Sequence, residues 1–573
     1  MQKGKLRRFL IPVLCLCLVL LLSGTALAEG KQEPPEKLSF SYDPGLGLLR
    51  ITANPELEQV ELSSTVFWNG DAEAVRALWL EGPITVMGRR AFSAFTNTEC
   101  VVVEDLPLQS VDANAFQYCT SITRIICIGS ESRYEVLKGK VGDSTTQWEY
   151  VNSRDRIFSV AAETVEHGTV VTDATPLVTA GTVIHMSILP DYGYLPDTSS
   201  YAAEQVIYRD TVLTGKCTDY RQIIASGSCG SKAAWQLEQS GNLRVFGVGT
   251  VTAVPDEEKV KWEEYREKIT AIHIDDAVLE IARSAFSGTY TREVHLGRYL
   301  KKLGGNAFSS SPQLRCVFLY ADLPTEGDAV SGTAFRYCNV LDRFFILGNE
   351  EDMERIRTKY DYNANAKFIS AEDWEEICRV DIEPIDESEG TVVTNASLYE
   401  KKGTRILISV LPNPGYRFGG ASPSDPSAVE YTASPNCFGI LGNVAFTVYT
   451  NVEYRELHQY DGETDTGSFG VLKKNKNIRW FLLADGELFI TGIGPITDYP
   501  WNNENYRDLA TGIVVDNGIT DIPGDCFSNL SKVTSVELGE DVATIGANAF
   551  RNPLLVTVQL PARVVGRSEE PHV

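Results

Sequence analysis

A repeated Ala-Phe pair is the feature that most restricts how this chain can fold. In the repeat around Ala307-Phe308, apolar residues stand four and seven positions before the pair and seven, ten and twelve after it. Neighbouring copies within a run are 22 to 27 residues apart. The seven copies, one with Cys in place of Ala, are Ala91-Phe92, Ala115-Phe116, Ala285-Phe286, Ala307-Phe308, Ala334-Phe335, Cys526-Phe527 and Ala549-Phe550. This fixed period predicts a solenoid in which each repeat packs on its neighbours.

Two tryptophan segments precede runs of this repeat. WQLEQSGNLRVFGVG from Trp235 and WFLLADGELFITGIG from Trp480 share Trp, Leu and Gly positions at a constant offset of 245. Both predict a strand, a glycine turn and a second strand. A shorter third copy, GLLRIT, begins at Gly47. Each run also has a tryptophan 23 to 25 residues before its first pair: Trp68, Trp262 and Trp501. We interpret these lead-in segments as caps, because a terminal repeat must cover the open edge of the core.

A third pair of copies lies between the runs. GTVVTDATPLVTAGTVIHMSILPDYGY from Gly168 and GTVVTNASLYEKKGTRILISVLPNPGY from Gly390 repeat their glycine and proline positions at an offset of 222. Short β-runs broken by Gly and Pro predict a small all-β module.

The Ala-Phe pattern resembles the BspA-type leucine-rich repeat, roughly IxxIxxxAFxxxxxLxxVxL, and the intervening copies resemble the InlB B-repeat, a β-grasp-like spacer. The resemblance implies a right-handed solenoid with one short strand per turn, stacked as a parallel sheet. We therefore predict an elongated, mainly β protein with short helices, containing three short leucine-rich-repeat solenoid segments separated by two small β-grasp-like, all-β spacers. The amphipathic segments SRYEVLKGKVG and EEDMERIRTKYD are expected to be helical and to close the first two solenoid segments.

The predicted order follows from these three families of copies. It comprises a signal peptide (1–28), array 1 (38–152), spacer 1 (156–225), array 2 (226–377), spacer 2 (378–455) and array 3 (456–566).

The N-terminal segment predicts secretion. Four basic residues precede an apolar run from Phe9 to Leu22, and a small-residue triplet ends at Ala28. The run is too short for a membrane span, which needs about 20 residues. We expect a secreted, extracellular protein, associated with the cell surface and without a membrane span after cleavage. Loss of the leader shifts the formal net charge from −25 to −29, which argues against nucleic acid as a partner.

No catalytic or cofactor motif is evident. The six histidines lie in no HExxH or Cys/His ligand spacing, and there is no GxSxG elbow, P-loop or dinucleotide fingerprint. We therefore predict neither enzyme activity, nor a cofactor, nor a metal site. Asp275-Asp276 has an equivalent in Asp516-Asn517, so a turn role is favoured over paired acid-base carboxylates. DGETDTG from Asp461 resembles a calcium loop but lacks the downstream bidentate Glu.

A ligand site is most plausible on the strand face of the arrays, because every second side chain of a strand points away from the core. We predict that the middle residue of each VxL unit faces outward. The candidate binding residues are Val102, Ile126, His295, Phe318 and Phe345. Phe318 and Phe345 should form an aromatic ladder, which is either exposed for recognition or covered by a flanking module. Array 3 presents Glu537 and Gln559 at these positions instead, which suits a structural role or a polar ligand.

The resemblance implies an extracellular protein that binds or adheres to proteins or glycans at the cell surface. The alternative is a structural surface or matrix protein whose arrays act as spacers.

Overall fold

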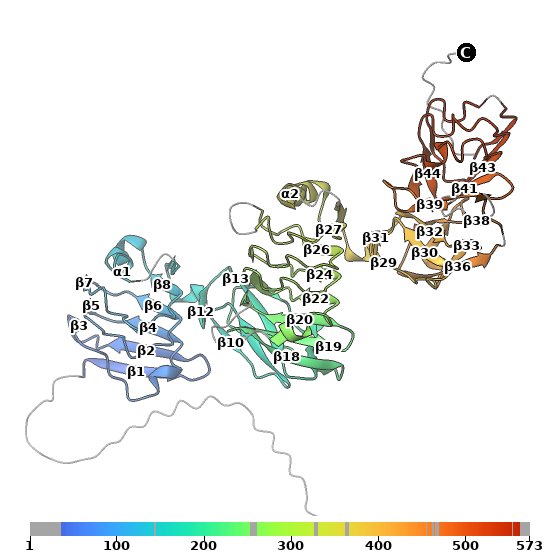
Figure 1. The fold of residues 1–573 in the computed structure, drawn as a ribbon. Helices are drawn as coiled ribbons and strands as arrows, with labels where there is room; N and C mark the ends of the chain where they lie inside the picture. The colour runs from blue at the N-terminus through green and yellow to red at the C-terminus, as the bar shows by residue number, and fades with distance from the viewer. Residues whose placement is uncertain are drawn as a thin grey trace, which may run out of the picture. The chain divides into compact units, whose positions relative to one another are not determined.

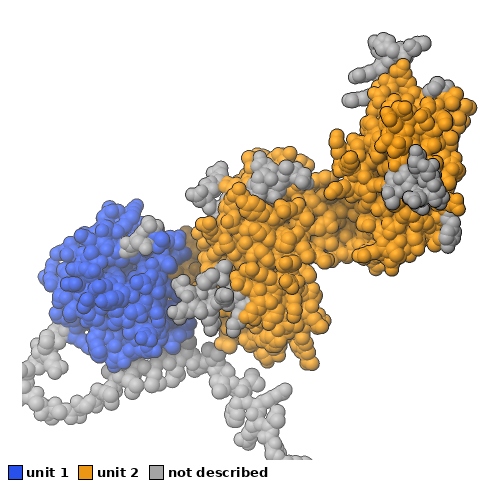
Figure 2. All heavy atoms as spheres, in the orientation of Figure 1, with its two compact units in different colours: residues 1–155 blue, residues 156–573 orange. Residues whose placement is uncertain are grey.

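The computed structural model describes residues 36–141, 145–252, 261–325, 331–360, 366–453, 455–460, 463–464, 469–552 and 554–561. The chain divides into two compact units, Met1–Asp155 and Arg156–Val573, coloured blue and orange in Figure 2. The expected signal peptide, residues 1–28, lies outside the described residues. Among the helices of the described ranges, none is both long and apolar enough to cross a bilayer.

A six-stranded sheet forms the framework of the first unit (Figure 1). Its first two strands are antiparallel, and each later strand is parallel to the one before it. In sheet order the strands are β1 (Leu38–Asp43), β2 (Leu48–Ala53), β4 (Ala77–Glu81), β6 (Cys100–Glu104), β8 (Arg124–Ile128) and β9 (Gln147–Val151). A narrow parallel sheet of β3 (Val60–Leu62), β5 (Ile84–Met87) and β7 (Ser110–Val111) accompanies it. The short helix α1 (Glu135–Lys138) stands between β8 and β9.

The second unit contains two more sheets of this kind. The first has eight strands: β18 (Ile223–Gly230), β19 (Ala233–Glu238), β20 (Asn242–Gly247), β22 (Ala271–Ile274), β24 (Glu293–His295), β26 (Cys316–Tyr320), β27 (Arg343–Leu347) and β28 (Lys367–Ala371). Its narrow companion is β21 (Gly249–Val251), β23 (Val278–Ile281) and β25 (Lys302–Leu303). Helix α2 (Glu350–Tyr360) buries Met353, Ile356 and Tyr360.

The other sheet belongs to array 3. Its strands are β39 (Phe469–Val471), β40 (Ile478–Leu482), β41 (Glu487–Gly492), β43 (Gly512–Val515), β45 (Ser535–Leu538) and β47 (Thr557–Gln559). Its narrow companion is β42 (Gly494–Pro495), β44 (Ile519–Ile522) and β46 (Thr544–Ile545). Each lead-in forms the expected antiparallel pair, β19–β20 and β40–β41, around a glycine of positive φ, Gly241 and Gly486.

Two small all-β segments complete the second unit. The first comprises β10 (Ile157–Ala162), β11 (Gly168–Thr172), β12 (Leu177–Thr179), β13 (Thr182–Pro190), β14 (Tyr194–Pro196), β15 (Glu204–Ile207), β16 (Thr211–Leu213) and β17 (Cys217–Asp219). The second comprises β29 (Ile377–Ile382), β30 (Gly390–Thr394), β31 (Tyr399–Lys401), β32 (Arg405–Pro412), β33 (Tyr416–Pro423), β34 (Val429–Tyr431), β35 (Cys437–Ile440) and β36 (Val444–Val452). The register repeats between them, since Gly168 faces Pro190 and Gly390 faces Pro412. The short hairpin β37 (Gln459–Tyr460) and β38 (Glu463–Thr464) follows.

The Ala-Phe pairs build the core of each array. In array 2 the rings of Phe286, Phe308 and Phe335 stack with centroids 5.1 and 5.5 Å apart, and all three are fully buried. Trp262 stacks on Phe286 at 4.9 Å and so covers the end of the ladder. Trp501 lies 5.5 Å from Phe527 in the same way. The expected mainly β fold of stacked parallel strands is therefore confirmed, and the tryptophans of the lead-ins act as caps.

Candidate functional site

One row of side chains on each array points away from the core. In array 2 the parallel register places His273 beside His295, His295 beside Phe318 and Phe318 beside Phe345. Their rings stack with centroids 4.2, 4.0 and 5.1 Å apart. A continuous ladder of four rings therefore runs along the strand face, on the side opposite the Phe286 core.

Exposure of the aromatic part of this ladder, one of the two outcomes considered from the sequence, does not occur. Phe318 is 5% exposed and Phe345 is 0% exposed. The ring of Trp374 lies 5.8 Å from Phe318, and that of Tyr399 lies 5.0 Å from it. Because Tyr399 belongs to β31, the following β-module covers the strand face. The prediction of an exposed aromatic binding strip on array 2 is therefore wrong.

The equivalent candidates of array 1 are not exposed either. Val102 and Ile126 are both 0% exposed, although their row is the one opposite the core. Val102 lies beside Trp79 in the register, and the Arg50 guanidinium lies 4.0 Å from that ring. Of the five strand-face candidates only His295 keeps partial exposure, with 28% of its side chain accessible.

His295 also belongs to a cluster of potential metal ligands. The ligand atoms of His273, Glu293 and His295 all lie within 4.8 Å of one another. His295 Nε2 is 3.8 Å from the Glu293 carboxylate. Within the described ranges this is the only group of three or more His, Cys, Asp or Glu residues that could hold a metal.

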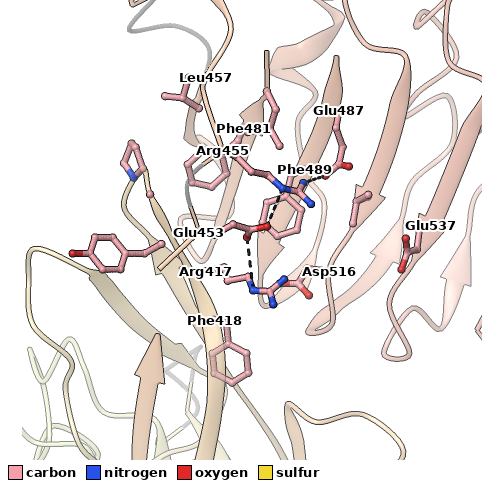
Figure 3. A pocket seen from close by; sticks show the side chains of 15 residues that line it. Arg417, Phe418, Glu453, Arg455, Leu457, Phe481, Glu487, Phe489, Asp516 and Glu537 are labelled. Carbon is pink, nitrogen blue, oxygen red and sulfur yellow. Dashed lines mark hydrogen bonds and ion pairs between the residues drawn. The ribbon is translucent and has the colours of Figure 1, made fainter. Parts of the chain in front are cut away.

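A pocket of about 320 Å³ opens where array 3 meets the β-module before it. Figure 3 shows Arg455 of the module beside Glu487 of the array and Arg417 beside Asp516, with Glu453 between the two arginines and Glu537 farther along the sheet. The array side is the same outward row, because Phe481, Phe489, Val514 and Glu537 are successive neighbours in the register. The outward row of array 3 is thus accessible at Phe489, Val514 and Glu537, whereas Phe318 and Phe345 of array 2 are covered.

Charged groups line this pocket in a chain of ion pairs. Arg417 Nε lies 3.7 Å from Glu453, and Arg455 Nε lies 2.8 Å from the same carboxylate. Arg455 also contacts Glu487. The rings of Phe481 and Phe489 stack beneath, with centroids 6.2 Å apart. The pocket therefore presents positively and negatively charged side chains over an apolar surface formed by the two rings.

Asp516 lines the pocket, and burial raises the pKa of its carboxyl group. It is already engaged: the Thr491 hydroxyl donates to it over 2.8 Å and the Asn517 N–H over 2.9 Å. Asp275 accepts from the Asp276 N–H in the same way, at 3.0 Å. Both aspartates thus have the turn role that was favoured over acid-base chemistry.

Residues 61–135, 264–373 and 504–569 match the family model described as the BspA type leucine rich repeat region, in six copies. These three stretches of the chain are BspA-type leucine-rich repeats. The two all-β segments, spacer 1 and spacer 2, lie outside the matched residues.

Two solved structures resemble this protein. One is a leucine-rich repeat protein from Eubacterium ventriosum, with 13% identity over 59% of this chain and 85% of that chain, and a TM-score of 0.17. The other is a leucine rich cell surface protein from Faecalibacterium prausnitzii, with 14% identity over 60% and 78% of the respective chains, and a TM-score of 0.12. No curated protein matches the chain.

Most residues of the pocket could not be predicted from the sequence. Glu537 was placed on the outward row by the BspA-type pattern, but Arg417, Glu453 and Arg455 lie outside the repeats. No periodicity connects them with array 3. The histidine cluster did leave a signal, since His273 and His295 are separated by one 22-residue repeat and therefore become strand neighbours. Asp461, the first residue of the candidate calcium loop, lies outside the described residues.

Proposed function

We propose that this leucine-rich repeat protein is a secreted, surface-associated binding protein, and that the pocket of array 3 receives an extracellular protein or glycan. The observation that carries the proposal is the open outward row of array 3, walled by the preceding module (Figure 3). Support for secretion comes from the basic, then apolar, then small-residue pattern at the N-terminus.

The charges of the pocket suit recognition. The side chains of Arg417 and Arg455 are 54% and 43% exposed, so their ion pairs with Glu453 and Glu487 lie in contact with water. Exposed ion pairs of this kind contribute at most about 1 kcal/mol each, and a ligand's charged groups can replace them at little cost. Half-buried Phe489 supplies an apolar surface beneath. A ligand with charged groups around an apolar or ring-shaped part fits this combination.

Binding is favoured over catalysis because Asp516, a pocket carboxylate with a raised pKa, already accepts two hydrogen bonds. Both hydrogen bonds come from array 3 itself and hold this carboxylate in its turn, the role favoured from the sequence. The neighbouring carboxylates Glu453 and Glu487 are paired with arginine.

The test is a binding screen of the full chain against immobilised extracellular proteins and a glycan array. Wild type is compared with Arg417→Glu, which reverses one pocket charge, and with Arg221→Glu as a matched control. The side chain of Arg221 is 89% exposed, and its Nε lies 3.2 Å from the carboxylate of Asp219. We expect a saturable, salt-sensitive ligand whose affinity falls at least about tenfold in Arg417→Glu and is unchanged in the control. Equal binding by both variants would remove the pocket as the ligand site.

A structural spacer is the second candidate function. The tight cover of Phe318 and Phe345 by the following module favours it, because a buried junction fixes the geometry between modules. The absence of saturable binding in the whole screen would support this alternative.

A further inference from the structure

A cluster of two imidazoles and one carboxylate lies on the outward face of array 2, away from the array 3 pocket. His273 comes from β22, and Glu293 and His295 come from β24. Residues i and i+2 of a strand share a face, so Glu293 and His295 project on the same side. The register sets His273 directly beside His295, with ring centroids 4.2 Å apart and an interplanar angle of 11°.

The geometry of these groups is not that of a hydrogen-bonded set. His295 Nε2 lies 3.8 Å from Glu293 Oε1, which is too long for a hydrogen bond. His295 Nε2 and Glu293 Oε2 are both buried atoms without a hydrogen-bond partner, and Glu293 as a whole is 6% exposed. A buried polar atom without a hydrogen-bond partner destabilises the fold, and more strongly when it is charged. Two ligands on one tetrahedral ion with bonds of about 2.0–2.1 Å are roughly 3.3 Å apart. The ligand atoms of the cluster lie within 4.8 Å of one another, so binding requires them to draw together and the stacked imidazoles to turn until their nitrogens face one ion.

The cluster supplies the donor atoms that a transition-metal ion uses. Each imidazole offers one ring nitrogen, and Glu293 offers a carboxylate oxygen.

Two guanidinium groups lie close to the cluster, and each has its own carboxylate. Arg244, whose charge interacts with His273, is paired with Glu238. Arg379, whose charge interacts with Glu293, is paired with Asp381 at 2.9 Å. Their positive charges are therefore largely compensated within the surrounding structure.

We propose that His273, Glu293 and His295 form a binding site for one divalent transition-metal ion of the zinc class. Two imidazole nitrogens and one carboxylate are a ligand set typical of zinc, and they leave a fourth position for water or a ligand group. Calcium and magnesium are disfavoured because they require oxygen ligands.

A bound ion has a structural consequence at the junction with spacer 2. The Tyr399 ring lies 6.5 Å from the His295 ring and 5.0 Å from Phe318, so the site is beside the covered part of the ladder. An ion that fixes His295 also fixes the surface on which Tyr399 packs. Because only the folded protein assembles the three ligands, metal binding raises the free energy of unfolding.

The experiment uses the full chain after dialysis against a chelator. ZnCl2 is titrated by calorimetry, and CoCl2 by visible absorption, which reports the coordination geometry directly. We compare wild type with His273→Gln, His295→Gln and the control His167→Gln, whose imidazole is 41% exposed and outside the cluster. Thermal unfolding with and without ZnCl2 provides a second readout.

We expect one zinc ion per chain, a tetrahedral or five-coordinate cobalt spectrum and a zinc-dependent rise in Tm for wild type and His167→Gln. His273→Gln and His295→Gln should bind zinc at least about tenfold more weakly and lose the Tm rise. CaCl2 should give no shift. The proposal is overturned if wild type binds no zinc at one equivalent, or if both cluster variants, folded as judged by their own Tm, bind as tightly as wild type. His295→Gln keeps the test decisive if His273→Gln fails to fold, because His295 is partly exposed.

Discussion

Arg343 Nη2 donates a hydrogen bond to Glu400 Oε1 over 2.7 Å, and the two side chains are only 7% and 2% exposed. Arg343 comes from β27 of array 2, whereas Glu400 comes from β31 of the following module. The Ser397 N–H donates to the same carboxylate oxygen at 2.7 Å. A buried charge pair adds little net stability, but removing one partner lowers the free energy of unfolding strongly.

Glu400→Gln should therefore destabilise the junction, by at most about 3–5 kcal/mol, because it leaves the buried Arg343 with only the more distant Asp342 carboxylate, 3.9 Å away, as a counter-charge. Urea unfolding followed by tryptophan fluorescence, to which Trp374 at this junction contributes, measures the loss. Glu354→Gln is the matched control: its pair with Arg357 is 56% exposed on both sides, so the expected change is within about 0.5 kcal/mol. The double variant Arg343→Met/Glu400→Leu should recover most of the stability, and no recovery would contradict this account.

The pH dependence of stability should carry a contribution from Asp275. Burial raises the pKa of Asp275 from 3.8 to about 6. The folded state therefore binds a proton that the unfolded chain has released, so the contribution of this group is present below about pH 4 and is lost as the pH rises through 6. Asp275→Asn removes it. We expect the free energy of unfolding of wild type, relative to that of Asp275→Asn, to fall between pH 4 and pH 6. A difference that stays constant in urea unfolding at pH 4, 5, 6 and 7 would contradict the assignment.

The sequence predicted what depends on the repeat period and missed what depends on contacts outside it. Phe286 and Phe308 had to stack because neighbouring turns of a solenoid repeat one register. The outward direction of Phe318 followed from strand alternation. Its burial did not, because Tyr399, which covers it, lies in a different module with no shared period.

The candidate sites illustrate the same division. Arg417 and Glu537 line one pocket although 120 positions separate them in the chain, and no local pattern relates the two. No linear ligand spacing such as HExxH includes His273 or His295, so the sequence predicted no metal site there. A parallel sheet, however, brings together residues one repeat apart, so the repeat alignment is the pattern in which such a cluster can be recognised.

Loss of one ring from the core ladder should be costly. Phe308 is 0% exposed and stacks on Phe286 and Phe335, at 5.1 and 5.5 Å. Phe308→Ala leaves a cavity between two neighbouring turns, so we expect a loss of about 3–5 kcal/mol in chemical unfolding. Phe67→Ala, at a side chain that is 83% exposed, should change stability by no more than about 0.5 kcal/mol. Similar losses in both variants would show that the ladder is not the source of stability.

Two glycines in the lead-in of array 2 differ in why they favour glycine: one is restricted by a close carbonyl oxygen, the other only by its backbone conformation. Gly247 has φ +126°, and a Cβ there would lie 2.1 Å from the Lys232 carbonyl oxygen. Gly249 has φ +95° with no atom within 4 Å of its Cβ position. Gly249→Ala should therefore cost about 1–2 kcal/mol from the left-handed backbone alone. Gly247→Ala should cost more than about 3 kcal/mol, because the hairpin partner is backbone and cannot move aside.

The equivalent site in array 3 provides an internal repeat of this comparison. A Cβ at Gly492 would lie 2.1 Å from the Asn477 carbonyl oxygen, whereas Gly494 meets only the Asn475 side chain, at 3.3 Å. Thermal unfolding of the four single alanine variants should therefore give the same order in both arrays, with the first glycine of each pair the more sensitive. Equal losses at Gly247 and Gly249 would mean that φ, not the close carbonyl, selects glycine in the lead-in.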